Sequence, residues 1–317
     1  MFNNIIHLDG PDKTGKDTQR DMLVKRSEGK YLVIVRSYLS QIVYSRIYNR
    51  DINENFFWDK LMHAYHVNGE QFYVLSCTEE TAKKRFIDAN EKDIHINEFL
   101  KHLGMFFEVV DEANEKCGVD IKIISTNSNA EYTYRNIQYH ILSNDMKTCN
   151  NCALHLLPEN EQNFLYGTGK LIPNAVTYFP KYMFVGMNPS RNRICCTEQP
   201  FAITDEEDKN EVFINILKTL DIYNDSYFTN IVKCSTANNK INNQNVRDCN
   251  EHIFNEIEVF KPEVIVALGT EVHKQLLALT PSIEQKIVKI HHPSYQYSYN
   301  GITPNDYHDQ IKLQILG

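Results

Sequence analysis

Four cysteines in the second half of the sequence have the residue type and the spacing of metal ligands. Cys149 and Cys152 form a Cys-x-x-Cys pair, Cys234 ends an apolar run, and Cys249 lies at the start of a segment with helical spacing. Four thiolates in two such groups can hold one zinc ion or one iron–sulfur cluster, and spacing alone does not separate the two. The other four cysteines are expected not to bind metal: Cys77, Cys117, Cys195 and Cys196.

A second motif, near the start of the chain, is typical of phosphate-binding loops. The segment Gly10-Pro11-Asp12-Lys13-Thr14-Gly15-Lys16 fits G-x-x-x-x-G-K and lies between an apolar run and a helical pattern. In such loops the main-chain N–H groups and the helix N-terminus surround phosphate oxygens, and the lysine neutralises the outer phosphates. Asp17 replaces the Ser or Thr that usually binds magnesium. The loop predicts a site for ATP and Mg²⁺ at Gly10, Lys13, Gly15, Lys16, Asp17 and Thr18.

The elements that must position these motifs alternate between short apolar strands and helices. In the first half we expect strands at 5–8, 31–35, 72–75 and 121–124, with helices at 17–26, 79–90 and 130–142. In the second half we expect strands at 182–185, 227–232, 264–268 and 287–290. This alternation predicts an α/β fold with mainly parallel sheets in two domains. We place the boundary where the pattern breaks, giving domains 1–145 and 146–317.

Length and composition agree with this organisation. A chain of 317 residues suggests two domains, and 42% hydrophobic with 23% charged residues is ordinary globular composition. The formal net charge of −8 excludes a global basic field, so any DNA contact needs a local patch. No apolar run of about 18 residues and no leader pattern occurs, which predicts a cytoplasmic protein with no membrane segment.

The second half resembles the family-four uracil-DNA glycosylases. The resemblance rests on the four cysteines and on several short sequence motifs that occur in the same order as in that family. These motifs are Tyr166-Gly167-Thr168-Gly169, Pro173-Asn174-Ala175, Val185-Gly186-Met187-Asn188-Pro189-Ser190, Gln199-Pro200-Phe201, Phe228-Thr229-Asn230-Ile231-Val232-Lys233-Cys234, Ile265-Val266-Ala267-Leu268-Gly269 and His291-His292-Pro293-Ser294. The resemblance implies an α/β/α domain with a four-stranded parallel sheet and a 4Fe–4S cluster on Cys149, Cys152, Cys234 and Cys249, with zinc as the alternative.

The same resemblance assigns roles around one base pocket. Asn230 offers a donor and an acceptor for the polar edge of uracil, and Phe201 offers a face on which the base stacks. His292 is expected to donate to the uracil O2 as negative charge develops, and Asn188 to position the attacking water. Gly186 and Met187 complete the expected contacts with the base. The Gly186-Met187-Asn188-Pro189 segment looks like the mismatch-specific glycosylases, so the pocket is open to 5-modified uracils.

The first half resembles thymidylate kinases and phage deoxynucleotide monophosphate kinases over residues 4–142. His7-Leu8-Asp9-Gly10, Arg36-Ser37-Tyr38-Leu39-Ser40 and Thr78 to Arg85 carry this resemblance, which adds Arg36 to the expected nucleotide contacts. Val35 stands where that family has the aspartate of its Asp-Arg motif. The first half is therefore interpreted either as a shortened, divergent kinase domain or as a degenerate kinase domain kept for nucleotide sensing or docking.

The combined interpretation is a phage-type fusion, located in the host cytoplasm, whose second domain hydrolyses the N-glycosidic bond of uracil or a 5-modified uracil in DNA. Its partners would be uracil-containing DNA and a nucleotide. One alternative is an enzyme of pyrimidine base hypermodification or a deoxynucleotide kinase. Another is a nucleotide-sensing DNA-binding module without catalysis.

Overall fold

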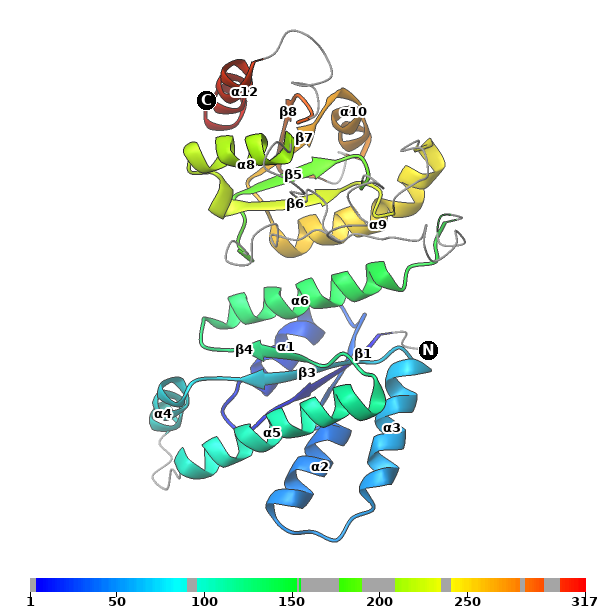
Figure 1. The fold of residues 1–317 in the computed structure, drawn as a ribbon, viewed down its shortest axis with the longest axis vertical. Helices are drawn as coiled ribbons and strands as arrows, with labels where there is room; N and C mark the ends of the chain where they lie inside the picture. The colour runs from blue at the N-terminus through cyan, green and yellow to red at the C-terminus, as the bar shows by residue number, and fades with distance from the viewer. Residues whose placement is uncertain are drawn as a thin grey trace. The chain divides into compact units, whose positions relative to one another are not determined.

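A computed structural model describes residues 4–89, 96–152, 154, 177–189, 209–234, 241–279, 283–293 and 303–317. The chain forms two compact units, unit 1 from Met1 to Ile137 and unit 2 from Gln138 to Gly317, and helix α6 (Ala130–Lys147) contains the division. Each unit holds a four-stranded parallel sheet (Figure 1). The predicted α/β class and the parallel pairing are confirmed.

Unit 1 has the strand order β2-β1-β3-β4. Its strands are β1 (Ile5–Asp9), β2 (Leu32–Val35), β3 (Gln71–Ser76) and β4 (Lys122–Ser125). Its helices, besides the first part of α6, are α1 (Lys16–Arg26), α2 (Tyr38–Ile47), α3 (Glu54–His66), α4 (Glu79–Asp88) and α5 (Ile96–Cys117). All four strands lie where the apolar runs predict them.

Helices cover both faces of the unit 1 sheet (Figure 1). On one face α2, α3 and α5 pack a core that includes Leu39, Trp58 and Phe106. On the other face α1 lies beside the start of α6, where the Arg26 guanidinium is 2.7 Å from a Glu131 carboxylate oxygen. Cys77 and Cys117 are both buried, as expected of core thiols.

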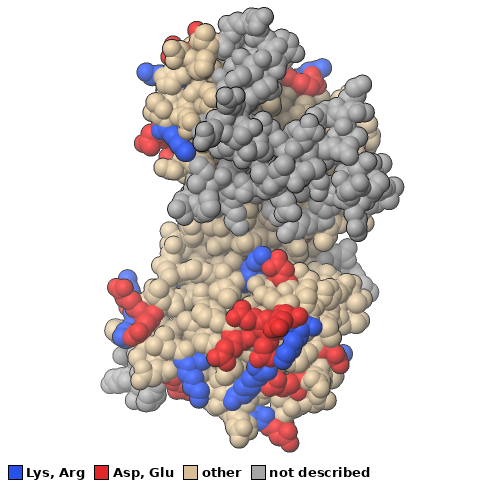
Figure 2. All heavy atoms as spheres, in the orientation of Figure 1, with Lys and Arg blue, Asp and Glu red and all other residues tan. Residues whose placement is uncertain are grey.

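The surface of unit 1 mixes opposite charges. Figure 2 shows acidic side chains next to lysines and arginines on the face in view. Arg46 is central to one such group, because its guanidinium bonds the carboxylates of both Glu54 and Glu112. In the part of the chain that is described, no helix is long and apolar enough to cross a bilayer.

Glu112→Gln is expected to destabilise unit 1 in a pH-dependent way. Hydrogen bonds from Arg46 and Lys116 lower the pKa of Glu112 to about 2. A depressed carboxylate pKa stabilises the fold above the unfolded value of about 4.3, and this contribution is lost as the pH falls through the folded value. The side chains of Glu112 and Arg46 are both half-buried at the surface, where water still screens their charges, so we expect a loss of only about 0.5–1 kcal/mol at pH 7, falling below half of that at about pH 3.

The measurement is urea unfolding followed by the fluorescence of Trp58, the single tryptophan of the sequence. Glu108→Gln, an exposed position on the same helix, is the control and should change stability at neither pH. An equal loss at both pH values would show that the ionised carboxylate of Glu112 is not the stabilising group.

Unit 2 has the strand order β6-β5-β7-β8. Its strands are β5 (Tyr182–Gly186), β6 (Ser226–Asn230), β7 (Val264–Leu268) and β8 (Lys286–Ile290). Its helices, besides the end of α6, are α8 (Lys209–Thr219), η2 (Tyr223–Asp225), α9 (Asn243–Phe260), α10 (Thr270–Leu279), α12 (Pro304–Ile311) and η4 (Lys312–Leu316). The four predicted strands are present.

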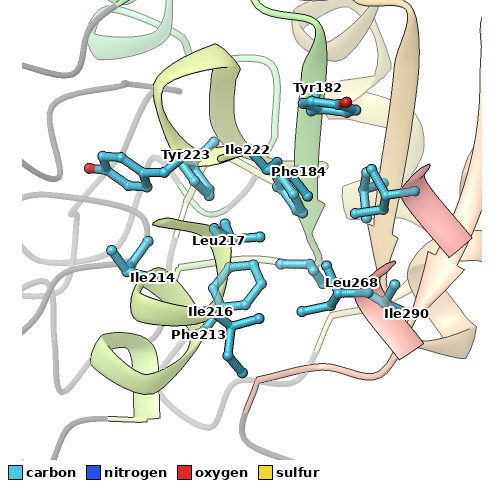
Figure 3. Packing of buried hydrophobic residues seen from close by; sticks show 14 of the residues in the cluster. Tyr182, Phe184, Phe213, Ile214, Ile216, Leu217, Ile222, Tyr223, Leu268 and Ile290 are labelled. Carbon is cyan, nitrogen blue, oxygen red and sulfur yellow. The ribbon is translucent and has the colours of Figure 1, made fainter. Parts of the chain in front are cut away.

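The helices that follow β5 and β6 lie on opposite faces of this sheet. Phe228 of β6 contacts Phe213 of α8, within the apolar cluster of Figure 3. Its neighbour Tyr227 contacts Phe260 of α9. Successive strand residues point to opposite faces, so α8 and α9 cover different sides. Ligands of such sheets bind outside the carboxyl ends of the strands where the connections diverge, which here is between the ends of β5 and β7.

Candidate functional site

The carboxyl edge of the unit 2 sheet collects the predicted catalytic and base-binding segments. Asn230 is the last residue of β6, Asn188 follows the end of β5, and His292 follows the end of β8. The strands run parallel in one sheet, with β7 between β5 and β8, so their carboxyl ends lie along the same edge. Phe201, the predicted stacking residue, lies outside the described residues.

Asn230 has an unsatisfied hydrogen-bond donor. The residue is 3% exposed, and its side-chain Nδ2 has no hydrogen-bond partner among the described residues. The main chain beside it is fixed, because Ile231 N–H donates to Gly186 O and Val232 N–H donates to Met187 O, both at 2.9 Å. A buried amide donor without a partner costs about 1–3 kcal/mol. Such a group points to a ligand that supplies the missing acceptor.

The segment after β5 runs directly beside Asn230. Gly186 pairs with Asn230 in the sheet and is buried. Met187 is half-buried and lines a cavity of about 570 Å³ together with the first turns of α9 and α10. The half-buried Asn188 donates from Nδ2 to Pro189 O at 3.1 Å. The structure therefore brings these three predicted residues next to Asn230.

His292 is exposed and lies against the end of β7. A Cβ atom built on Gly269 would be 3.8 Å from His292 Cβ, and Gly269 N–H donates to Ile290 O at 2.9 Å. The preceding residue is anchored to α12, because the Tyr307 hydroxyl donates to His291 O at 2.7 Å. His292 thus follows two residues whose main-chain carbonyls are held by hydrogen bonds.

Beneath this edge lies a buried polar network that the sequence analysis missed. Lys233 Nζ lies 2.5 Å from Glu256 Oε2, and the two side chains are 2% and 0% exposed. Thr229 Oγ1 lies 2.7 Å from Lys233 Nζ and 2.9 Å from Glu256 Oε1. A signal was available, since Lys233 interrupts an apolar run and Glu256 falls on the apolar stripe of α9.

The four predicted metal ligands come from three segments of unit 2. Cys149 and Cys152 follow α6, Cys234 follows β6, and Cys249 lies on α9. Cys152, Cys234 and Cys249 are buried, and Cys149 is half-buried. Within the described ranges, no three His, Cys, Asp or Glu side chains take the arrangement of a metal-ion site.

The thiols nevertheless affect the pKa values of one another. Burial, followed by the neighbouring Cys249, Cys152 and Cys149, raises the pKa of Cys234 well above its usual range. Burial also raises the pKa of Cys249 to about 11. His252 Nε2 lies 3.2 Å from Cys149 Sγ. Four thiols are soft donors of the type that binds iron or zinc, so the chemistry of the donor set suits the expected group.

In unit 1 the G-x-x-x-x-G-K segment forms the loop between β1 and α1. Lys16 begins the helix and is 5% exposed, and its ammonium donates to Gly10 O at 2.7 Å and to Pro11 O at 2.6 Å. Burial lowers the pKa of Lys16. Lys13 has a left-handed backbone with φ of 65°, and Arg36, across the loop, has φ of 67°. Strained non-glycine residues of this kind cluster at binding sites.

The loop opens on a cavity of about 1040 Å³. Its cationic lining consists of Lys13, Lys16, Arg20, Arg36 and Arg85, and its acidic lining of Asp12, Asp17 and Glu98. The cations are partly paired, since Arg36 lies 3.1 Å from Asp12 and Arg20 lies 3.0 Å from the exposed Asp17. The exposed Thr18 also lines the cavity. All seven predicted contacts thus lie on this loop and cavity.

Arg85 and Asp9 fix the elements around the cavity. Arg85 on α4 donates to Lys13 O at 3.0 Å and to Thr126 Oγ1 at 2.8 Å, which fixes the loop against the end of β4. Asp9 is fully buried and accepts from Ser37 N–H at 2.8 Å and from the Ser40 hydroxyl at 2.5 Å. These bonds tie the end of β1 to the start of α2.

Comparison with known proteins identifies relatives of the second unit. Residues 173–312 match the family model described as the uracil DNA glycosylase superfamily. A type-4 uracil-DNA glycosylase of Thermotoga maritima is 31% identical over 131 residues, which are 41% of this chain and 60% of that protein. Type-4 enzymes of Pyrobaculum aerophilum and Archaeoglobus fulgidus are 26% and 28% identical, over 50% and 39% of this chain and 74% and 56% of theirs.

These matches confirm the resemblance predicted for the second half. The chain spans 60% of the length of the Thermotoga protein, so the match covers a part of each partner. The family match begins at residue 173 and leaves the kinase-like resemblance of residues 4–142 a prediction.

Proposed function

We propose that unit 2, whose residues 173–312 match the uracil DNA glycosylase superfamily, hydrolyses the N-glycosidic bond of uracil or a 5-modified uracil in DNA. The observation that carries this proposal is the buried amide donor of Asn230 at the carboxyl edge of the sheet, which has no partner among the described residues. Uracil presents a carbonyl acceptor and an N–H donor side by side, which one amide group complements. The type-4 relatives support the same substrate class.

The neighbouring residues supply the rest of the chemistry. The departing base carries negative charge, and His292 donates to it from the end of β8. Asn188 holds the water that attacks the sugar, from a segment fixed beside Asn230. The target nucleotide must leave the duplex to reach this edge, as for other enzymes that act on a base.

The four cysteines are proposed to hold an iron–sulfur cluster, with zinc as the alternative. Cys149 and Cys152, Cys234 and Cys249 would join the end of α6, the end of β6 and α9. The bound group would act as a structural brace beneath the site. Visible absorbance with iron and sulfide in the purified protein supports a cluster, and a colourless protein containing zinc contradicts it.

The glycosylase proposal is tested on end-labelled oligonucleotides that contain uracil, 5-hydroxymethyluracil or thymine. After incubation, alkali cleaves the strand wherever a base has been removed. We expect cleavage at uracil and none at thymine, and the hydroxymethyluracil substrate reports the tolerance for 5-substituents. Absence of cleavage on every substrate by protein that retains its cofactor would favour a binding module without catalysis.

A second candidate function belongs to unit 1, whose cavity is lined by five lysine and arginine side chains around the loop. We infer that this cavity binds a nucleotide phosphate with Mg²⁺. Asp17 stands at the usual magnesium position, although Arg20 pairs with it. Phosphoryl transfer to a deoxynucleotide is the activity that such a site would support.

Lys16→Met is expected to weaken nucleotide binding by about 10- to 100-fold, because charge-assisted hydrogen bonds contribute about 1.5–3 kcal/mol each. Isothermal titration calorimetry with ATP and with dTMP, each with Mg²⁺, measures the change. Lys25→Met removes an exposed lysine from the last turn of the same helix and is the matched control. Equal affinities of the two variants would remove Lys16 from the phosphate site.

A further inference from the structure

The buried ion pair of Lys233 and Glu256 is an unusual feature of the unit 2 core. Both side chains are almost fully removed from water, and their charged atoms are 2.5 Å apart. Burial of such a pair costs several kcal/mol per ion, and apolar replacements of similar volume are often as stable or more so. Stability alone therefore does not account for the pair.

The ammonium of Lys233 has all three of its donors occupied. It donates to Glu256 Oε2, to Thr229 Oγ1 at 2.7 Å and to Asn230 O at 2.7 Å. The third bond holds the peptide group of Asn230, whose buried side-chain Nδ2 has no partner in the part of the chain that the structure describes. Fixing a peptide plane limits the backbone torsions on either side, and with them the direction of the Asn230 side chain.

Glu256 anchors the other end of this arrangement. It accepts from the Thr229 hydroxyl and, at 3.1 Å, from the Tyr227 hydroxyl, so α9 is bound to two residues of β6. Burial, and then the Glu256 carboxylate, raises the pKa of Tyr227, so the hydroxyl remains a donor. The main chain of Lys233 also hydrogen-bonds Cys249, one of the four cysteines.

We propose that Lys233, held by Glu256, is a positioning residue for base recognition, which clamps the Asn230 carbonyl and aims the Asn230 amide at the base. This inference rests on the proposed glycosylase function. Lys233 lies beneath the site and touches no substrate, so its effect is transmitted through Asn230. The same clamp links the base-reading end of β6 to the helix that carries Cys249.

The test removes both charges together, because removal of one would leave the other buried and unpaired. In Lys233→Met/Glu256→Gln, Met approximates the lysine stem and Gln keeps acceptors for Thr229 and Tyr227. We expect kcat on uracil DNA to fall by about 10- to 100-fold, the scale of a small misplacement of a recognition group, with KM within about threefold. Lys83→Met/Glu79→Gln makes the same change in an exposed pair of α4 and should leave both unchanged.

Coupling to Asn230 separates positioning from a general structural role. In an Asn230→Ala background the Lys233→Met/Glu256→Gln change should reduce kcat little further, because the group it positions is already absent. A full, independent reduction in that background would overturn the proposal. Thr229→Val keeps both charges but removes the bridging hydroxyl, and should lower kcat severalfold in the same non-additive way.

Amide hydrogen exchange provides a readout that does not need turnover. In Lys233→Met/Glu256→Gln, peptides covering residues 226–234 should exchange at least about tenfold faster, while those of β5 and β7 do not change. An unchanged exchange rate at 226–234 would contradict the proposed clamp even if the protein is an active glycosylase. Faster exchange there in a protein with no activity on uracil DNA would support the clamp and refute the proposed function.

Discussion

Asn230→Ala is expected to lower kcat/KM on uracil-containing DNA by about 100- to 1000-fold, the loss that follows removal of one preorganised donor from a desolvated site. Nδ2 of this residue is buried and unpaired among the described residues, so its desolvation is already complete before the base arrives. A base carbonyl that bonds to it gains the full interaction. Single-turnover cleavage of a uracil oligonucleotide measures the effect.

Two further variants test whether the loss of activity comes from the amide donor of Asn230. Asn230→Asp keeps the size of the side chain but removes the amide donor, and should be impaired to a similar degree on uracil. Asn215→Ala changes an exposed asparagine of α8 and should retain full activity. If Asn230→Ala, properly folded, cleaves uracil DNA as fast as the wild type, the base is not read at the end of β6.

Gly10→Ala is expected to destabilise unit 1 by more than about 3 kcal/mol, in the range that only a specific steric or buried polar fault reaches. An ideal Cβ at this position would lie 2.3 Å from the main-chain oxygen of Leu75, and φ is +128°. The obstructing atom belongs to the backbone of β3, so no side-chain rotation relieves the contact. The loop or the strand must move, which should also abolish nucleotide binding.

Gly29→Ala separates the backbone torsion from the clash. Gly29 also has a positive φ, +83°, but nothing lies within 4 Å of its ideal Cβ. Its substitution should cost only about 1–2 kcal/mol, the penalty of a left-handed conformation for an L-residue. Urea unfolding followed by Trp58 fluorescence compares the two variants. Similar losses for both would show that the loop yields easily at Gly10.

Hydrophobic patterning predicts most of this fold because the strands are parallel and helices cover the sheets, so the strands form apolar runs. Residues 264–268 and 182–186 are buried at every position, and such strands appear as uninterrupted apolar runs. The motifs also place Asn188, Asn230 and His292 at or just after strand ends, which a parallel sheet brings to one edge, and their roles at a base pocket stay a prediction. Phe201 stays a prediction, because it lies outside the described residues.

Pairings between distant polar residues were beyond the reach of the pattern. Lys233 and Glu256 are 23 residues apart, and their apolar neighbours in the sequence indicate that each is buried but not that the two are partners. Only the packing of α9 onto β6 shows that the two meet. The same holds for Asp9, whose partners Ser37 and Ser40 are the N-cap and a first-turn residue of α2. A residue pattern reports which side chains prefer burial, not which polar groups compensate one another.

The left-handed backbone at Lys13 and Arg36 has a consequence for laboratory evolution of this protein. Each holds a conformation that glycine adopts freely, at a cost of about 1–2 kcal/mol to an L-residue. A screen for heat resistance alone would therefore enrich glycine at both positions. It would also remove two cationic side chains from the cavity lining, so the heat-resistant variants should bind anions more weakly.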